Sequence, residues 1–154
     1  MKVAGIVAEY NPFHNGHRYQ IDQTRANGAT HIIAVMSGNF VQRGEGALWD
    51  KHTRAAAAVR GGADLVLQLP TAHTLSGASV FAGAGVFIAD SFGVPTSLCF
   101  GSEDADISDL FALADIDREK LSQNFKKLTA KGISYAAAAQ KAYELCSANA
   151  QILK

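Results

Sequence analysis

Four short, nearly continuous apolar runs constrain the fold of this chain more than any other feature of its sequence. They cover residues 3–8, 31–36, 63–69 and 97–100, and turn residues or segments of helical character flank them. Because the hydrophobicity does not alternate, the runs predict strands covered on both faces. Helical patterns lie between them at residues 15–26, 50–60 and 76–92. The order predicts an α/β fold with a doubly wound, Rossmann-like parallel sheet.

The chain changes character after residue 100. Residues 104–117 are acidic, residues 117–131 place apolar side chains on one helical face, and residues 134–147 are typical of an alanine-rich helix. No strand pattern follows these helices. From a length of 154 residues, 48% of them hydrophobic, we expect one domain, with residues 1–103 as its α/β core and residues 104–154 as a helical extension of it.

The charges are distributed unevenly, although the net charge is zero. Residues 1–60 hold seven basic and four acidic residues, which leaves seven basic and ten acidic residues for the rest of the chain. A basic first part is expected where phosphates bind, but a solvated surface can carry the same bias.

Cysteine usage and the first residues indicate the compartment. Cys99 and Cys146 are the only cysteines and form no CxxC pair, which is typical of reduced thiols in a cytosolic protein. The apolar start is too short for a signal peptide or a membrane span, and Glu9 closes it. We therefore expect a cytoplasmic protein without a membrane partner.

The strongest chemical signal is the segment GIVAEYNPFHNGH at residues 5–17, where a strand leads through a turn into a helix start. Residues three apart share a face of the first helical turn, so His14 and His17 can donate imidazole N–H groups to one anion there. Gly16 permits close approach of a nucleotide to the backbone. Preset donors of this kind stabilise the charge that develops on phosphates during adenylyl transfer, so we interpret both histidines as catalytic.

Two other interpretations of the histidine pair stay open. A helical metal pair more often has a spacing of four residues and a neighbouring carboxylate, as in HExxH, and this pattern is absent. We therefore expect no metal site formed by protein side chains. Alternatively, His14 and His17 are polar residues that cap the helix.

Further polar residues follow the second strand. Ser37, Gly38 and Asn39 lie where a substrate or phosphates can be contacted, and an ordinary polar turn explains them equally well. A basic cluster comes next and consists of Gln42, Arg43, Lys51 and Arg54.

The spacing of three between Lys51 and Arg54 puts both on one face of a helix that Asp50 caps. We favour phosphate contacts of ATP or RNA for this cluster over a solvated helix face. The stretch GAGVFIAD at residues 83–90 lacks the third glycine of a dinucleotide fingerprint, and close helix packing explains its glycines better.

The chain resembles the bacterial tRNA(Met) cytidine acetate ligase family within the HIGH-motif nucleotidyltransferases. His-x-Gly-His after the first strand is the superfamily signature. The segments AVMSGNFVQRGEGALWDKHTRA (residues 34–55), GADLVLQLP (62–70), ASVFAGAGV (78–86) and CFGSE (99–103) are similar to that family in the same order. Most coenzyme-making adenylyltransferases have Phe-Asp-Pro where this chain has Tyr-Asn-Pro at residues 10–12.

The resemblance implies an enzyme that activates acetate with ATP to acetyl-adenylate and then acetylates the wobble cytidine of elongator tRNA(Met). Any Mg²⁺ is expected to arrive with ATP. The implied ATP contacts are Gly101 and a continuous segment made of Val7, Ala8, Glu9, Tyr10, Asn11, Pro12, Phe13, His14, Asn15, Gly16, His17, Arg18, Tyr19 and Gln20.

Members of this family are longer than 154 residues. We therefore expect a fragment or a truncated relative. A nucleotide-binding fragment without turnover and a coenzyme-type adenylyltransferase remain as alternative functions.

Overall fold

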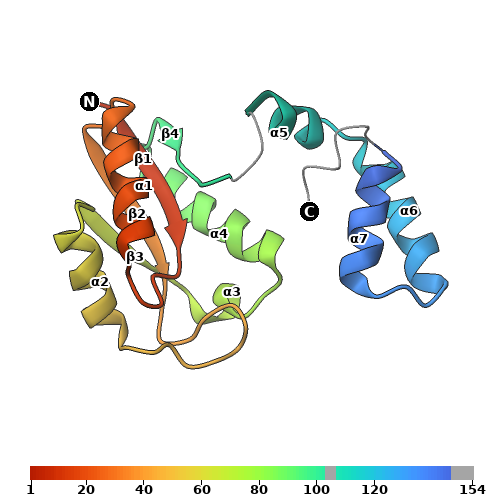
Figure 1. The fold of residues 1–154 in the computed structure, drawn as a ribbon, viewed down its shortest axis with the longest axis horizontal. Helices are drawn as coiled ribbons and strands as arrows, with labels where there is room; N and C mark the ends of the chain where they lie inside the picture. The colour runs from red at the N-terminus through yellow and green to blue at the C-terminus, as the bar shows by residue number, and fades with distance from the viewer. Residues whose placement is uncertain (103–106, 147–154) are drawn as a thin grey trace. The chain divides into compact units, whose positions relative to one another are not determined.

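The computed structural model describes residues 1–102 and 107–146, and only the backbone of residues 109, 112 and 113 (Figure 1). The chain forms two compact units, Met1–Gly101 and Ser102–Lys154. They divide two residues before the predicted boundary between residues 103 and 104, which lies outside the described residues. That residues 104–154 extend the same domain stays a prediction.

The first unit is built on a parallel sheet with the strand order β3-β2-β1-β4. Its strands are β1 (Val3–Ala8), β2 (His31–Ser37), β3 (Leu65–Leu69) and β4 (Ser97–Leu98). β1 pairs with β2 along its whole length and with β4 through two residues only. The α/β fold with a doubly wound parallel sheet, predicted from the apolar runs, is confirmed.

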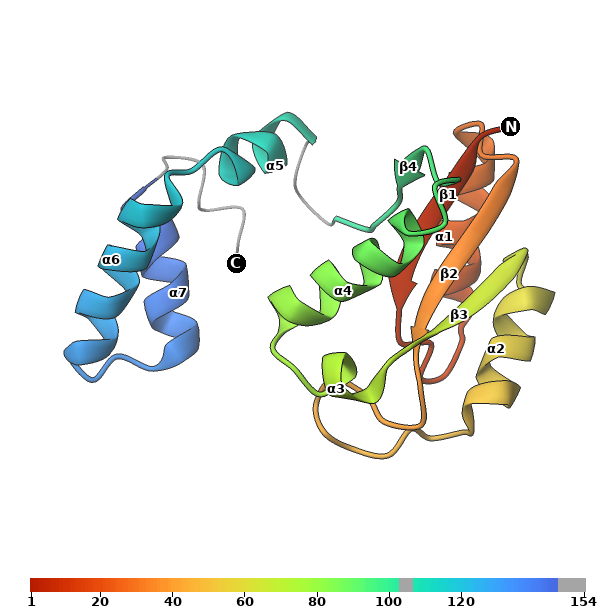
Figure 2. The same cartoon turned by 180° about the vertical axis from the view of Figure 1, so that it is seen from behind.

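Helices cover both faces of this sheet, as Figures 1 and 2 show. Helices α1 (Asn15–Ala26) and α2 (Lys51–Arg60) lie on one face, and α3 (Thr71–Thr74) and α4 (Ala78–Asp90) on the other. Alternate residues of β2 serve the two layers, since Ile32, Ala34 and Met36 join the core of α1 and α2 whereas Val35 packs with Ala89 of α4. Continuous hydrophobicity therefore reflects burial on both sides.

Several elements differ from the sequence-based boundaries, and β4 ends at Leu98 rather than at residue 100. β3 begins at Leu65 rather than residue 63, because Asp64 is used in a turn where its carboxylate accepts the Ile32 N–H (2.7 Å) and pairs with Arg25 (2.7 Å). The helix predicted at residues 76–92 is α4, and the separate helix α3 precedes it. A helix of four residues is too short to show a periodic pattern.

Glycine lets α4 approach the end of β1 closely. A Cβ atom on Gly85 would lie 2.5 Å from Cγ1 of Val7, which is closer than real side chains come. Gly83 has no such neighbour within 4 Å. The packing explanation for this glycine-rich helix therefore holds at Gly85.

The second unit contains α5 (Ile107–Ala114), α6 (Arg118–Ala130) and α7 (Tyr135–Glu144). Asp117 caps α6, and the rings of Phe125 and Tyr135 meet edge to face at 5.0 Å between α6 and α7. The two helices predicted at residues 117–131 and 134–147 correspond to α6 and α7, and Ser147 lies outside the described residues. Within the described parts of the chain, no helix is long and apolar enough to cross a membrane.

Candidate active site

The loop after β1 and the first residues of α1, together called the HIGH loop here (residues 9–17), lie at the carboxyl edge of the sheet. Its backbone turns sharply: Tyr10 has a φ of 50°, and the Asn11–Pro12 peptide bond is cis. Two of its side chains accept backbone N–H groups of the loop after β2. The Glu9 carboxylate accepts from Gln42 at 2.6 Å, and the Asn11 amide oxygen accepts from Leu48 at 2.7 Å. The two loops are therefore held together as one rim.

The two histidines of the motif form a capping box at the start of α1. Nδ1 of His14 accepts the N–H of Gly16 at 3.1 Å, and Nδ1 of His17 accepts the N–H of His14 at 3.2 Å. Both bonds satisfy backbone N–H groups that a helix start leaves without a partner. A Cβ atom at position 16 would lie 3.0 Å from Cε1 of His14, so glycine at this position also makes room for that ring.

The capping bonds decide which ring nitrogen carries the proton. A nitrogen that accepts a hydrogen bond is not protonated, so the proton of each ring is on Nε2. The two rings stack with their centroids 3.7 Å apart and their planes inclined by 23°. Each ring therefore keeps an Nε2–H donor that no capping bond uses, beside the N-terminus of α1.

Aromatic packing keeps His17 neutral. Its ring meets Tyr10 edge to face at 4.8 Å and lies 5.6 Å from Phe13. Burial among these rings, with a smaller contribution from His14, lowers the pKa of His17 to about 4. The hydroxyl of Tyr10 is buried and has no hydrogen-bond partner among the residues that the structure describes, and burial raises its pKa to about 12.

The helix-capping interpretation and the anion-binding interpretation of the histidines are therefore compatible. Capping uses Nδ1 of each ring, and anion binding would use Nε2 together with the positive end of the α1 dipole. Sequence spacing predicted the shared face but could not show which nitrogen points inward. As for the metal interpretation, no group of three or more His, Cys, Asp or Glu side chains suited to a metal ion is found among the described residues.

Arg54 corrects one of the predicted phosphate contacts. The side chain is fully buried (0% exposed), and all five of its N–H groups donate to protein oxygen atoms. Nε donates to Trp49 O (3.0 Å), Nη1 to Glu9 O (2.6 Å) and Ser37 Oγ (3.4 Å), and Nη2 to Ser37 O (3.1 Å) and Gly38 O. No donor remains for a ligand, so Arg54 holds the carboxyl ends of β1 and β2 against α2 instead.

The charge of Arg54 is accommodated without a direct ion pair among the described residues. Burial lowers its pKa, and the negative charges of Glu9 and Asp50 act in the opposite direction. Arg54 therefore remains a cation whose charge faces carbonyl oxygens at the rim.

The residues predicted after β2 separate into internal and surface positions. Ser37 and Gly38 are buried and accept hydrogen bonds from Arg54. Asn39 is exposed, and its side chain accepts the backbone N–H of Lys51 at 3.2 Å. Nζ of Lys51 donates to Oε1 of Gln68 at 2.7 Å.

Of the proposed cations, Lys51 and the exposed Arg43 have no acidic partner in the part of the chain that the structure describes. Sequence reasoning missed Gln68, although one polar residue near the end of the apolar run LVLQL was a usable signal.

β4 ends at Leu98, opposite Gly5 in the middle of β1, and the chain after it contacts α1. Thr24 Oγ1 lies 2.9 Å from Sγ of Cys99, and the Gln20 side chain donates to Cys99 O at 3.5 Å. Gly101 follows two residues later and is exposed, and no heavy atom of the described residues lies within 4 Å of the position a Cβ would take. Gly101 is thus open to a ligand, while Glu103 of the same motif lies outside the described residues.

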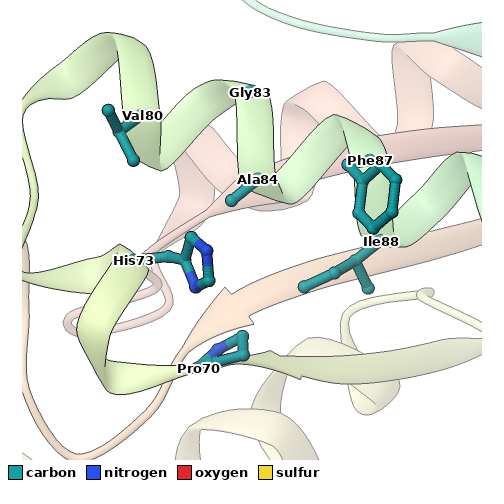
Figure 3. Close-up of a pocket in the computed structure, with 7 residues that line it drawn as sticks. All are labelled: Pro70, His73, Val80, Gly83, Ala84, Phe87 and Ile88. Atoms are coloured by element: carbon teal, nitrogen blue, oxygen red, sulfur yellow. The ribbon is translucent and has the colours of Figure 1, made fainter.

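A separate apolar groove lies between α3 and α4, on the face of the sheet opposite α1 and α2. It has a volume of about 490 Å³, and the imidazole of His73 points into it among Val80, Ala84, Phe87 and Ile88 (Figure 3). None of the predicted site residues lines this groove. We therefore treat the rim formed by the HIGH loop and the loop after β2 as the candidate active site.

Comparisons with known proteins show the family of this chain. The family model described as HIGH Nucleotidyl Transferase matches residues 1–154. A tRNA(Met) cytidine acetate ligase of Clostridium kluyveri is 46% identical over 142 residues, which covers 90% of this chain and 35% of the relative. Another from Acetivibrio thermocellus is 40% identical over 153 residues, covering 97% of this chain and 37% of the relative.

A solved structure extends the comparison to three dimensions. The crystal structure of Thermotoga maritima TmcAL bound with alpha-thio ATP has a TM-score of 0.85 and 43% sequence identity. The match covers 92% of this chain and 35% of that chain. The chain therefore spans little more than a third of the length of the relatives it matches, 35% to 37% for the two ligases.

Proposed function

The chain belongs to the HIGH nucleotidyl transferase family, and from this premise we propose that it forms the adenylate-forming part of a tRNA(Met) cytidine acetate ligase. In the first step an acetate oxygen attacks the α-phosphorus of ATP, and the bond to the leaving pyrophosphate breaks. In the second step the exocyclic amine of the wobble cytidine attacks the carbonyl carbon of acetyl-adenylate. AMP leaves, and the amine loses a proton.

The paired Nε2–H donors of His14 and His17 are the observation that carries this proposal. The two rings stack with their centroids 3.7 Å apart at the N-terminus of α1, where the helix dipole also favours a phosphate. Negative charge grows on the oxygens around the α-phosphate as pyrophosphate leaves. Donors that are already oriented stabilise this charge without reorganising during the reaction.

The low pKa of His17 suits a donor rather than a proton-transfer group. At neutral pH the ring is neutral and its proton stays on Nε2, because the pKa is about 4. The reaction itself needs no nucleophilic side chain, since acetate and then the cytidine amine are the nucleophiles. His17 thus acts by hydrogen bonding and charge stabilisation.

Within residues 7–20, the exposed positions His14, Asn15, Gly16, Arg18 and Tyr19 are open to direct contact with ATP in this proposal. The Tyr10 ring acts through its packing against the ring of His17, as only 1% of the residue is exposed. Gly101 borders the nucleotide from the side of β4. Mg²⁺ would enter on the triphosphate, with water completing its coordination.

The acceptor RNA and its location follow from the same proposal. Exposed Arg43 and half-buried Lys51 lie on the loop and the helix next to the HIGH loop, where they can meet RNA phosphates. The wobble base lies in a single-stranded loop, so it can enter the site without opening a duplex. A tRNA acceptor places the reaction in the cytoplasm.

Acetate-dependent exchange of pyrophosphate into ATP tests the proposed first step. We expect exchange with acetate, and none with a mononucleotide acceptor, from a chain extended to the length of the relatives. Residues 1–154 alone should bind ATP weakly in calorimetry and exchange little, because Arg54 is internal and few cations of the first unit can close over a triphosphate.

Three other outcomes would change the proposal. Exchange that needs a mononucleotide rather than acetate would identify a coenzyme-type adenylyltransferase. ATP binding without any exchange in the extended chain would identify a nucleotide-binding module without turnover. Strong exchange by residues 1–154 alone would show that pyrophosphate exchange needs no further cations to close over the triphosphate.

A further inference from the structure

The loop between β2 and α2 exposes large apolar side chains close to the candidate site. Phe40, Leu48 and Trp49 are 46%, 65% and 51% exposed. Single exposed apolar residues are ordinary on a protein surface, but a group on one loop marks an interaction site. The phosphate contacts predicted for this loop involve only its polar and basic residues. They assign no role to Phe40, Leu48 and Trp49.

Internal hydrogen bonds give this loop a defined shape. Ala47 N donates to Asn39 O at 2.9 Å, Val41 N donates to Glu45 O at 3.0 Å, and Phe40 pairs with Gly46 in an antiparallel bridge. A loop that is already ordered loses less conformational entropy when it binds a partner. The backbone that carries its exposed side chains is therefore already ordered before a partner binds.

Three further bonds fix the loop to the active-site rim. Leu48 N donates to the Asn11 side chain at 2.7 Å, Gln42 N donates to the Glu9 carboxylate at 2.6 Å, and Trp49 O accepts from Arg54 at 3.0 Å. Leu48 is thus hydrogen-bonded to the HIGH loop, and Trp49 is hydrogen-bonded to Arg54, the arginine that holds this loop in place.

A hollow of about 330 Å³ adjoins the indole of Trp49, with Leu48, Asp50 and Thr53 as the other walls. The apolar walls suit the face of a flat ring. Asp50 supplies acceptor oxygens at the edge, where one oxygen already accepts from His52 N and Thr53 N and the other from the Thr53 hydroxyl. A carboxylate oxygen has capacity for a further donor, such as the amino group of a base.

We propose that Leu48 and Trp49, the apolar walls of this hollow, form a stacking surface for an unpaired base of an RNA acceptor. The inference rests on the proposed function for the identity of the acceptor. Every base has a π-face, so stacking tolerates any sequence, while Arg43 and Lys51 lie close by in the chain for the negatively charged RNA backbone. The surface holds the single strand beside the site where its neighbouring base reacts.

Trp49 is the only tryptophan of the chain, so its fluorescence reports directly on this surface. Residues 1–154 are titrated with an RNA hairpin that has an unpaired loop, and separately with a fully paired duplex of the same stem. We expect the hairpin to quench the emission and the duplex to leave it nearly unchanged. No quenching up to about 100 μM hairpin, where even non-specific binding is detected, would overturn the proposal.

Substitutions measure the contribution of the ring to affinity. Trp49→Ala should weaken hairpin binding about 5- to 150-fold, which is the range for loss of one stacked base. Trp49→Phe should lose much less because it keeps an aromatic face. The matched control is Phe87→Ala on α4, an aromatic residue that is 72% exposed on the other face of the sheet. Equal affinity of the wild-type and Trp49→Ala chains would overturn the proposal.

Two measurements separate this inference from its alternatives. A blue shift of Trp49 emission that grows with protein concentration, in the absence of RNA, would assign the surface to protein contacts and overturn the proposal. Acetate-dependent pyrophosphate exchange requires no RNA, so it tests the proposed function independently. Hairpin quenching without acetate-dependent exchange in the extended chain would retain the stacking surface and reject acetate activation. Exchange in the extended chain without quenching would retain acetate activation and reject the stacking surface.

Discussion

Replacement of Arg54 by methionine tests whether this buried cation is structural. Methionine keeps much of the apolar volume but supplies none of the five N–H donors. The backbone oxygens of Glu9, Ser37, Gly38 and Trp49 would lose a partner at once. Both edges of the candidate site, the HIGH loop and the loop after β2, depend on these oxygens.

The expected cost follows from the contacts. A hydrogen bond to a charged group contributes about 1.5–3 kcal/mol, so five bonds give an upper bound of roughly 7–15 kcal/mol. Removing a guanidinium from the interior regains several kcal/mol of desolvation. The bonds to Glu9 and Trp49 are only partly buried, so water can replace some of them. We expect Arg54→Met to lower the free energy of unfolding by about 3–5 kcal/mol.

Urea unfolding followed by circular dichroism measures this change. Arg60→Met is the matched control, because Arg60 is exposed at the end of the same helix and should change stability by less than about 0.5 kcal/mol. Arg54→Lys should fall between the two, since lysine keeps the charge but not the planar set of donors. A cost below about 1 kcal/mol for Arg54→Met, together with loss of ATP binding, would refute the structural role and restore the phosphate contact.

The remaining predictions concern the histidines and the RNA side of the rim. His17→Gln should reduce acetate-dependent exchange in the extended chain about a hundredfold to a thousandfold and leave the fold intact, because Gln at this position can preserve the capping box. Near-normal exchange would exclude the donor role. Because burial holds the pKa of His17 at about 4 against 6.5 in the unfolded chain, the unfolded chain binds more protons between these values. The free energy of unfolding should therefore fall as the pH is lowered from 6.5 to 4, and urea unfolding of His17→Gln should show a weaker dependence. Reversal of Arg43 and Lys51 to Glu should weaken tRNA binding and flatten its salt dependence; unchanged affinity and slope in filter binding would move the contact elsewhere.

The sequence was sufficient for elements whose physical signal is local. The apolar runs located all four strands of the first unit, and Asp50 marked the start of α2 through its capping side chain. The spacing of His14 and His17 predicted their common face, which the stacked rings confirm. Each of these features depends on residues within one turn or one strand.

Features set by tertiary packing were beyond the sequence. Residues 55–58 of α2 are four consecutive alanines, which place small apolar side chains on every face of the helix. No amphipathic stripe therefore shows which face of α2 is buried. Spacing therefore placed Arg54 with Lys51 but could not show that Arg54 enters the interior. The helix α5 is only eight residues long, which is shorter than the stretch needed to recognise a helical period.

The capping box of α1 couples ligand binding to the local order of the chain. While the cap is closed, Nδ1 of each ring is occupied and both Nε2–H groups are fixed as donors. When the first turn frays, the rings are free to exchange tautomers and rotate, and the donor pair is lost. By linkage, an anion that binds the donor pair must hold the cap closed in proportion to its affinity. The amide hydrogens of His14 and Gly16, although they lie on an exposed loop, should then exchange with solvent more slowly as nucleotide binds.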